Sequence, residues 1–147
     1  MSENFDDPSA NKVLVVDNDE IVLNALKEQL PPMGFHPTVV NSAPLAKEHL
    51  AAEIFAVVII DGNLGGEGMG LLEQTRKAQP DCSRIMLASG ISVEELSRVL
   101  ESGLIYRYLT KPWMGNDLHV ALVNAAERYR MIKENEALQN RNMQLSE

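Results

Sequence analysis

The sequence predicts an α/β protein in which a five-stranded parallel sheet is covered by helices on both faces. Short apolar runs alternate with amphipathic segments of helical period along most of the chain, a pattern typical of strands joined by right-handed helical crossovers. The central run, residues 55–60 (FAVVII), is apolar at every position, as expected for a parallel strand that is buried on both faces. Together these observations indicate a doubly wound sandwich.

The first part of the chain contains two strands and one helix. Residues 12–16 (KVLVV) predict a buried strand, and residues 20–30 predict a helix. The Pro-Pro-Met-Gly sequence at residues 31–34 is expected to end this helix. Residues 36–40 predict a short second strand. We expect the helix to bury a face formed by Ile21, Val22, Ala25, Leu26 and Leu30.

Turn-forming residues mark the second helix and the loop after the central strand. Ser42 is a suitable N-cap for a helix with Pro44 in its first turn, where a missing backbone N–H costs little. Residues 62–70 are rich in glycine and predict a loop. A helix is expected to follow over residues 71–78, and a fourth strand over residues 84–88.

The last third of the chain predicts a helix, the fifth strand and a long terminal helix. The first of these helices covers residues 93–101 and is closed by Gly103. We expect its buried face to comprise Val93, Leu96, Val99 and Leu100. The fifth strand is expected over residues 104–109, and a helical pattern runs from about Asn116 almost to the C-terminus.

Composition and charge limit the classes of function. With 147 residues, 45% of them hydrophobic, the chain is long enough for one domain with its own core. The net charge of −8 opposes binding to phosphate backbones, so we expect no direct contact with nucleic acid. No apolar run approaches the roughly 20 residues of a membrane span. The polar residues 1–11 are expected to form a disordered lead, and the single cysteine, Cys82, fits a reducing cytoplasm.

Reactive side chains follow four of the predicted strands. The first strand ends in Asp17-Asn18-Asp19-Glu20, the third in Asp61, the fourth in Ser89-Gly90 and the fifth in Thr110-Lys111-Pro112. In a doubly wound sheet, ligands bind beyond the carboxyl ends of the strands. Each group also has a plain structural interpretation, because Asp17 or Asp19 could simply cap the following helix. The coincidence at four strand ends favours a common site.

Two carboxylates and one ammonium group at these ends predict a site for a cation and an anion. Adjacent strands lie ~4.8 Å apart, so Asp17 and Asp61 repel each other if the first and third strands are neighbours. Oxygen ligands with few nitrogen or sulfur ligands among them suit a hard ion, above all Mg²⁺. Lys111 would supply a further fixed positive charge.

Four stretches of the chain together resemble the receiver domains of two-component response regulators. They are VLVVDNDE, VVIIDGNLGG, IMLASG and YRYLTKPW. The resemblance covers residues 12–128 and implies a flavodoxin-like fold with strand order 2-1-3-4-5. It also implies a cytoplasmic signalling domain, not an enzyme with its own substrate turnover. Such a domain takes a phosphoryl group from a histidine kinase or a phosphotransfer protein, and it changes conformation to control an output.

The same resemblance implies roles for individual residues. Asp61 would be the phosphoryl acceptor, Lys111 would pair with the phosphoryl group, and Ser89 would donate a hydrogen bond to it. The Mg²⁺ shell would include Asp17, Asn18, Asp61 and the backbone carbonyl of Asn63. Tyr108 would be the aromatic residue that turns inward on activation, and Pro112 would follow a cis peptide bond.

The sequence departs from the family pattern at two places. Asn18 stands where a second acid usually contacts the metal, so we expect weaker Mg²⁺ binding unless Asp19 or Glu20 compensates. The loop after the acceptor usually reads Met-Pro-Gly, whereas this chain has Leu-Gly-Gly at residues 64–66. Without the fixed φ of proline, the loop is expected to be looser.

Three other interpretations are compatible with parts of the sequence. Residues 17–21 approximate the nucleophile motif of haloacid-dehalogenase-like phosphatases, but no paired acids follow Lys111 to hold their metal. Residues 65–70 have half of a P-loop spacing, but leucines replace its lysine and hydroxyl residue. The third alternative is a pseudo-receiver, an interaction module that is not phosphorylated, which Asn18 makes worth testing.

The terminal helix carries a seven-residue repeat. Asn124, Met131, Leu138 and Leu145 form one seam, and Arg128, Asn135 and Asn142 form the companion seam. Leucine at one core position with asparagine at the other is typical of parallel dimeric coiled coils. We therefore expect residues 129–147 to be a coiled-coil-like extension that makes a homodimer or leads to a C-terminal output domain. A lone amphipathic helix is the alternative.

The identity of that output is suggested only by resemblance. Residues 105–113 look like receivers linked to HD-GYP-type phosphodiesterases or other signalling enzymes. The heptad pattern is unfinished at residue 147, which suggests a chain truncated ahead of such a domain.

Overall fold

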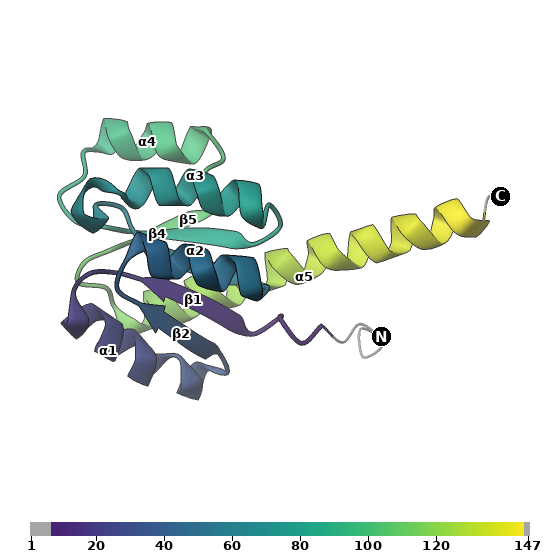
Figure 1. Ribbon diagram of the computed structural model, residues 1–147, viewed down its shortest axis with the longest axis horizontal. Coiled ribbons are helices and arrows are strands. Elements are labelled where there is room, and N and C mark those ends of the chain that lie inside the picture. The colour runs from purple at the N-terminus through teal and green to yellow at the C-terminus, as the bar shows by residue number, and fades with distance from the viewer. Residues whose placement is uncertain (1–6, 146–147) are drawn as a thin grey trace.

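The structure is a computed structural model that describes residues 7–145. These residues contain the predicted five-stranded parallel sheet, with strand order β2-β1-β3-β4-β5 (Figure 1). The strands are β1 (Lys12–Val16), β2 (His36–Val40), β3 (Val57–Asp61), β4 (Ser83–Ala88) and β5 (Arg107–Thr110). The flavodoxin-like fold and the strand order implied by the resemblance are therefore confirmed.

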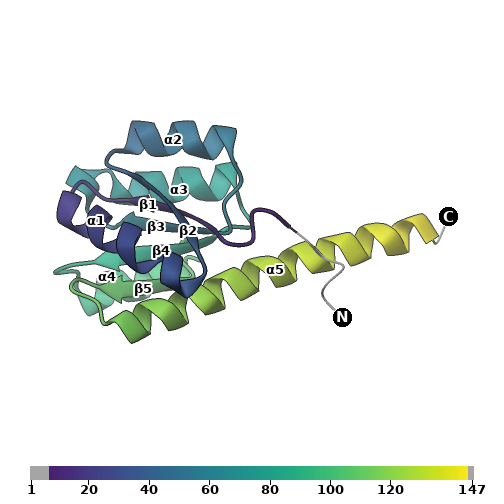
Figure 2. The same ribbon diagram turned by 90° about the horizontal axis from the view of Figure 1, so that it is seen from below.

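Helices cover both faces of the sheet, as Figure 2 shows. They are α1 (Glu20–Gln29), α2 (Ala43–Ala52), α3 (Gly68–Ala78), α4 (Val93–Glu101) and α5 (Gly115–Leu145). Two 3₁₀ turns, η2 (Pro31–Met33) and η3 (Leu64–Gly66), lie between these elements. Helices α1 and α5 pack on one face, whereas α2, α3 and α4 lie on the other.

Alternation along the strands produces the two apolar layers. Ile59 and Leu87 belong to the layer under α1 and α5, whereas Ile60 and Met86 belong to the layer under α2, α3 and α4. Because successive side chains of a strand point to opposite faces of the sheet, a strand that is apolar at every position serves both layers. All five residues of β3 are buried, so this strand is the centre of the core.

The predicted buried face of α1 is wrong for one residue, Ile21. Ile21 lies in the first turn of the helix and is 79% exposed, whereas Leu23 is buried. The buried residues Val22, Leu23 and Leu26 share one side of α1. A rotation of about 100° per residue turns Ile21 away from that side.

Helix α4 packs few side chains against the sheet, and the prediction that Val93 and Leu100 are buried is wrong. Val93 and Leu100 are 80% and 39% exposed. Within α4 only Val99 is buried, with Leu96 packed against the same apolar cluster. The helix is therefore anchored through little more than one side chain, although its sequence pattern is strongly amphipathic.

The largest differences from the predicted element boundaries, three residues each, occur at the starts of α3 and β5 and result from local packing. Helix α3 begins at Gly68 rather than at residue 71, and Gly68 lies so close to β3 that an added Cβ would be 2.4 Å from the carbonyl oxygen of Asp61. Strand β5 begins at Arg107 rather than at residue 104. The preceding residues Leu104 and Ile105 are buried in a loop that fills the core without pairing to β4.

Residues 7–11 form an ordered turn against α5. Ser9 Oγ lies 2.7 Å from the hydroxyl of Tyr129, and this hydroxyl donates a hydrogen bond to Asp7 Oδ2 at 3.1 Å. Tyr129 is 1% exposed. The expectation of a disordered lead over residues 1–11 is therefore wrong for residues 7–11, whereas residues 1–6 lie outside the described residues.

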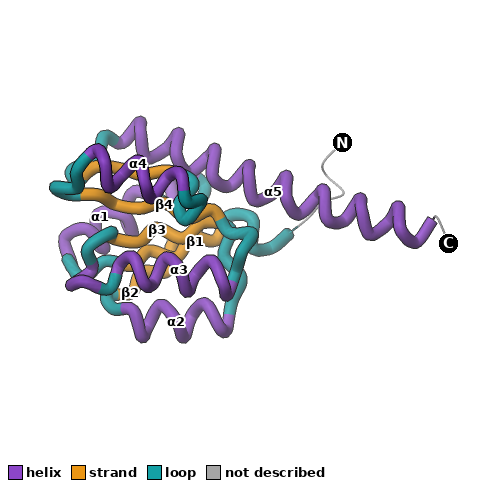
Figure 3. The backbone as a smooth tube through the Cα atoms, turned by 90° about the horizontal axis from the view of Figure 1, so that it is seen from above, coloured by secondary structure: helices purple, strands orange, loops and turns teal. Residues whose placement is uncertain are grey.

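Helix α5 is tied to the domain along its first half and extends away from it along its second half (Figure 3). Ser83 Oγ donates a hydrogen bond to the carbonyl oxygen of Ala125 at 2.7 Å, and Lys133 Nζ lies 2.9 Å from Asp81 Oδ2. Beyond this ion pair, residues 135–143 are all exposed. The side chain of Leu145 and residues 146–147, at the end of the predicted seam, lie outside the described part.

Tyr129→Phe tests the tie between the N-terminal turn and α5. We expect the free energy of unfolding to fall by roughly 1–2 kcal/mol, because one buried hydroxyl and its hydrogen bonds are lost. Burial raises the pKa of the Asp7 carboxyl, but hydrogen bonds from Ser9 and Tyr129 outweigh it and lower that pKa below its ordinary value of 3.8. The stabilisation by ionised Asp7 is therefore present above about pH 4 and lost as the pH falls.

The measurement is urea denaturation at neutral pH and at about pH 3, with Tyr106→Phe as the matched control on an exposed tyrosine. The difference between Tyr129→Phe and wild type should shrink at the lower pH. If the two substitutions changed the free energy of unfolding equally at neutral pH, the contact between the N-terminal turn and α5 would contribute nothing to stability.

Candidate functional site

Three predicted site residues converge at the carboxyl end of the sheet. Asp17 directly follows β1, Asp61 ends β3, and Lys111 directly follows β5. Strands β1 and β3 are paired neighbours, so the two carboxylates lie side by side, as the sequence indicated. Lys111 Nζ lies 2.6 Å from Asp17 Oδ2 and 3.4 Å from Asp61 Oδ1. Its backbone N–H donates to the carbonyl oxygen of Ala88 at 2.9 Å, which fixes the end of β5 against β4.

The Asp17 carboxylate is fully buried and only partly satisfied. Its Oδ1 atom accepts a hydrogen bond from the backbone N–H of Asp19 at 2.9 Å. Its Oδ2 atom accepts no hydrogen bond of good geometry, although the Lys111 ammonium lies close to it. An ionised carboxylate can accept several bonds, so this atom retains unused capacity to accept one.

The Asp61 carboxylate is held in place by the loop that follows it. Its Oδ2 atom accepts a hydrogen bond from the N–H of Leu64 at 3.0 Å, and its Oδ1 atom accepts a longer one from the N–H of Asn63 at 3.4 Å. Asp61 is 6% exposed. The Asp61 carboxylate is therefore oriented by backbone groups and by Lys111, and little of it is exposed to solvent.

The charge of Lys111 is stabilised by its two acidic neighbours. Burial by itself lowers the pKa of this ammonium group, but the close contact with Asp17 and the charge of Asp61 outweigh burial and raise the pKa above its ordinary value. Lys111 is therefore positively charged throughout the physiological range. One ammonium group between two carboxylates leaves the cluster one positive charge short of neutrality.

The oxygen atoms at this site fit a hard divalent cation. The unsatisfied Oδ2 atom of buried Asp17, beside the carboxylate of Asp61, provides the oxygen donors that Mg²⁺ prefers. Within residues 7–145, however, no group of three or more His, Cys, Asp or Glu residues could hold a metal ion. The fit thus rests on two carboxylates, neutral oxygens and water.

The side chain of neither neighbouring acid has a recorded contact with the side chains of Asp17, Asp61 or Lys111. Asp19 is the N-cap of α1, and its side chain accepts the N–H of Ile21 at 2.9 Å, so the capping interpretation holds for this residue. Glu20 lies exposed in the first turn of the same helix. Asn18 is exposed and lies near the glycine loop, where its Nδ2 atom would be 3.9 Å from a Cβ added at Gly65.

The remaining predicted residues surround this cluster without a recorded contact to it. Ser89 follows β4 and is exposed. Tyr108 is 38% exposed and lines a surface hollow with Trp113, Asp117 and Val120, so its ring is turned outward. The Lys111–Pro112 peptide bond is cis, the isomer that the resemblance implies.

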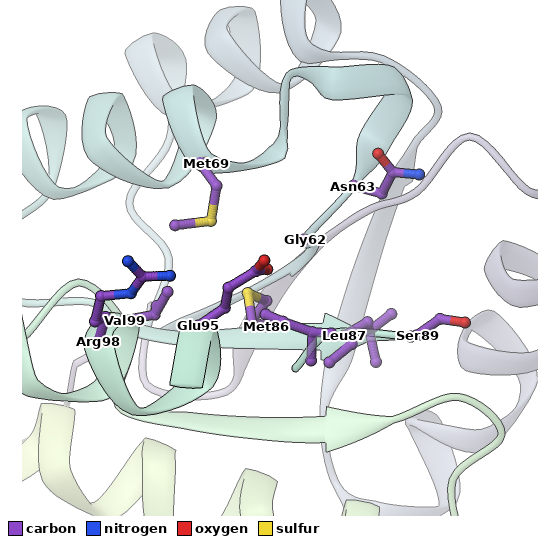
Figure 4. Close-up of a pocket in the computed structure, with 12 residues that line it drawn as sticks. Gly62, Asn63, Met69, Met86, Leu87, Ser89, Glu95, Arg98 and Val99 are labelled. Carbon is purple, nitrogen blue, oxygen red and sulfur yellow. The ribbon is translucent and has the colours of Figure 1, made fainter. Parts of the chain in front are cut away.

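A cavity of about 410 Å³ beside the loop after Asp61 was not foreseen from the sequence. It lies between α3, α4 and the end of β4, and Figure 4 shows Met69 and Met86 directed into it. Gly62, which directly follows Asp61 in the chain, lines it together with Ser89. Sequence periodicity could not reveal it, because it exists only where thinly packed α4 fails to fill the space above β4.

Comparison with known proteins assigns the family. Residues 13–123 match the response regulator receiver domain family, and the chain therefore belongs to this family. Receiver domains act in signalling rather than in independent catalysis, and they are typically Mg²⁺-dependent. This result, with Asp17 fully buried, leaves no support for the alternative in which Asp17 is a phosphatase nucleophile.

Individual relatives agree with this assignment. A putative NtrX-like response regulator from Rickettsia conorii is 29% identical over 126 residues, which cover 84% of this chain and 26% of that protein. A structure of adenylate cyclase from Rhodopirellula baltica aligns with a TM-score of 0.82 at 26% identity, covering 88% of this chain and 97% of that chain. The signal receiver domain of an HD domain-containing protein from Pseudomonas fluorescens Pf-5 aligns with a TM-score of 0.78 at 29% identity, covering 88% and 96%.

Two further observations bear on the wider context of the domain. This chain spans about a quarter of the length of the curated relatives it matches, for example 26% of the Rickettsia protein. Over residues 7–145, none of the helices has the length and apolar character needed to cross a membrane.

Lys111→Met tests the electrostatic balance of the cluster. Removing the ammonium group leaves two buried carboxylates side by side, so we expect the free energy of unfolding to fall by about 3 kcal/mol. This value is near the lower end of the range for broken buried ion pairs, because Lys111 is partly exposed. The measurement is urea denaturation with EDTA present.

The matched control is the double variant Asp17→Asn with Lys111→Met, which removes both partners of the closest pair. It should recover most of the lost stability, because two adjacent carboxylates no longer repel each other and only Asp61 still lacks a counter-charge. A double variant as unstable as Lys111→Met alone would contradict the ion-pair explanation.

Proposed function

We propose that this receiver domain accepts a phosphoryl group on Asp61 from the phosphohistidine of a sensor kinase or a phosphotransfer protein. The single observation that supports this best is the Lys111 ammonium between the Asp17 and Asp61 carboxylates, at 2.6 and 3.4 Å. A charge arrangement of this kind binds a cation and an anionic phosphoryl group at one place. Its position at the carboxyl end of a doubly wound sheet agrees with the general location of ligand sites in such folds.

The chain's own residues account for the transfer step. An Asp61 carboxylate oxygen attacks phosphorus, a new P–O bond forms as the P–N bond of the donor breaks, and the imidazole leaves with the electron pair. The Leu64 N–H orients the carboxylate, and Lys111 neutralises charge on the equatorial oxygens. A bound Mg²⁺, held by Asp17, Asp61 and neutral oxygens near Asn18 and Asn63, would supply further neutralisation of this charge.

The phosphoryl group would act on the thinly packed side of the domain. Ser89 lies in the β4–α4 connection, Tyr108 is turned outward, and α4 is held mainly by Val99. A hydrogen bond from Ser89 to the phosphoryl group would draw this connection toward Asp61 and allow Tyr108 to move inward. A change from mostly inactive to mostly active requires about 5.5 kcal/mol of differential interaction, which a few charge-assisted bonds of roughly 1.5–3 kcal/mol each supply.

Acceptance of one phosphoryl group can be tested by intact mass. After incubation with acetyl phosphate and Mg²⁺, we expect wild-type protein to gain the mass of one phosphoryl group. Asp61→Asn removes the nucleophile and should gain none, whereas Asp19→Asn serves as the control, because Asp19 is an exposed cap that the reaction does not use. A wild-type mass that stays unchanged with several donors would favour the pseudo-receiver alternative.

We further propose that α5 joins two copies of the chain and carries the signal to an output module at its free end. Arg128 lies 3.2 Å from Ser83 Oγ and stacks over the ring of Tyr106. Because Arg128 is engaged in these contacts within the domain, it is not available to a dimer seam. Such a seam would begin at Met131, after the end of the receiver domain expected at residue 128. Met131 and Leu138 are 55% and 53% exposed, and a second α5 packed along this stripe would cover both.

The output itself is proposed by analogy with two of the similar solved structures. The curated relatives are longer than this chain, and similar receivers occur in an HD domain-containing protein and in a protein described as an adenylate cyclase. A signalling enzyme at the C-terminal end of α5 is the output we favour. We propose no direct contact of this domain with nucleic acid or membrane, in keeping with its net charge of −8.

Leu138→Glu tests the dimer. A charged residue at the centre of the seam should convert a dimer into a monomer, because two carboxylates would then face each other in an apolar contact. Sedimentation velocity over a range of protein concentrations gives the oligomeric state. Asn140→Glu adds the same charge elsewhere on the exposed helix and should leave the dimer intact. A monomeric wild type would contradict this part of the proposal.

A further inference from the structure

The loop after Asp61 contains an unusual left-handed turn. Leu64, Gly65 and Gly66 have φ values of 42°, 62° and 92° in succession. Leu64 is the only non-glycine residue with a positive φ among residues 7–145, and such a conformation is uncommon for a side-chain-bearing residue. Its side chain is 5% exposed and belongs to the apolar layer under α2, α3 and α4. The buried side chain therefore holds the backbone in this conformation.

The turn occupies the backbone carbonyl of Asn63. This oxygen accepts a hydrogen bond from the N–H of Gly66 at 2.7 Å and a second from the N–H of Gly68 at 3.2 Å. A backbone carbonyl has two lone pairs, so both are in use. The Asn63 carbonyl is the oxygen that the family resemblance assigns to the metal shell, yet here it is committed to the loop.

Glycine at position 65 is what makes this turn possible. The loop reads Leu-Gly-Gly where the family pattern has Met-Pro-Gly. Proline fixes φ near −65° and cannot adopt the φ of 62° observed at Gly65. Gly68 then packs against the carbonyl oxygens of Asp61 and Gly62, which an added Cβ would approach to 2.4 and 2.3 Å. The loop is thus a closed, hydrogen-bonded turn rather than the looser segment that its glycine content suggested.

We infer that residues 63–68 form a latch that withholds the Asn63 carbonyl from the cation site at Asp17 and Asp61. Binding of a divalent cation through that carbonyl requires at least one of the two hydrogen bonds to break. The same loop donates the Leu64 N–H to Asp61 Oδ2, so opening the latch also changes the environment of the acceptor. Cation binding and loop opening are therefore coupled, and this coupling rests on the metal site of the proposed function.

Substitutions at Gly65 test the latch through Mg²⁺ affinity. Gly65→Ala strains the left-handed conformation and Gly65→Pro forbids it, so both release the Asn63 carbonyl to different degrees. We expect Gly65→Pro to bind Mg²⁺ about tenfold more tightly than wild type, equivalent to about 1.4 kcal/mol, with Gly65→Ala in between. Isothermal titration calorimetry with MgCl₂ on the unphosphorylated chain gives these affinities.

Gly70→Ala is the matched control. This glycine lies in α3 with nothing within 4 Å of an added Cβ, so alanine there should leave Mg²⁺ affinity unchanged. If Gly65→Pro does not fold, the comparison of Mg²⁺ affinity between Gly65→Ala and the wild type still tests the latch. Equal Mg²⁺ affinity in the wild type and both Gly65 variants would overturn the latch.

Amide hydrogen exchange of the wild type gives an independent readout. Without Mg²⁺, the N–H groups of Gly66 and Gly68 should be protected, because both donate to the Asn63 carbonyl. Saturating Mg²⁺ should speed the exchange of at least one of them while leaving core amides of β3 unchanged. Protection that is unaffected by Mg²⁺ in a protein that binds it would refute the coupling.

These measurements separate the latch from the phosphorylation proposal. Neither calorimetry nor amide exchange uses a phosphodonor, so the latch can be refuted while Asp61 still accepts a phosphoryl group. Conversely, a chain that gains no phosphoryl mass can still show the affinity difference between wild type and Gly65→Pro.

Discussion

The burial of the Asp17 carboxylate is the constraint on which the rest of the site depends. A fully buried charge is costly unless an opposite charge compensates it, and here the compensation comes from Lys111, whose position requires β5 to end beside β4. The ion pair therefore couples the first strand to the last. It also leaves the Asp61 carboxylate beside a fixed positive charge, which is the arrangement that the proposed transfer of an anionic phosphoryl group requires.

Packing strength is distributed unevenly around this cluster. On one face, α1 and the first half of α5 bury continuous apolar stripes, and α5 is further tied through Tyr129 and Lys133. On the other face, α4 is held by little more than Val99 and lies beside a cavity. Weakly anchored elements open at low free-energy cost. The domain thus has a firmly packed side that bears the extended helix and a loosely packed side next to Asp61.

Much of the site was predictable because its chemistry resides in residue types at strand ends. Parallel strands bring their carboxyl ends to one edge, so Asp17, Asp61 and Lys111 could be expected to meet once the strands were recognised. Finer points were not predictable in this way. The sequence left open whether Asp17 or Asp19 caps α1, and the structure assigns this cap to Asp19. Ile21 is exposed because helix phase, not hydrophobicity alone, decides which side chains face the core.

The sequence by itself determined the alternation of strands and helices, the strand order implied by its motifs, and the identity of the charged residues at the sheet's edge. Only the tertiary structure decided the left-handed turn that occupies the Asn63 carbonyl, the tie between Ser9 and Tyr129, and the cavity beside α4. The physical reason is that periodicity records which side chains avoid water, a local property. Backbone dihedrals in a glycine loop, and contacts between residues 120 positions apart, are settled only when the packed layers restrict the choices.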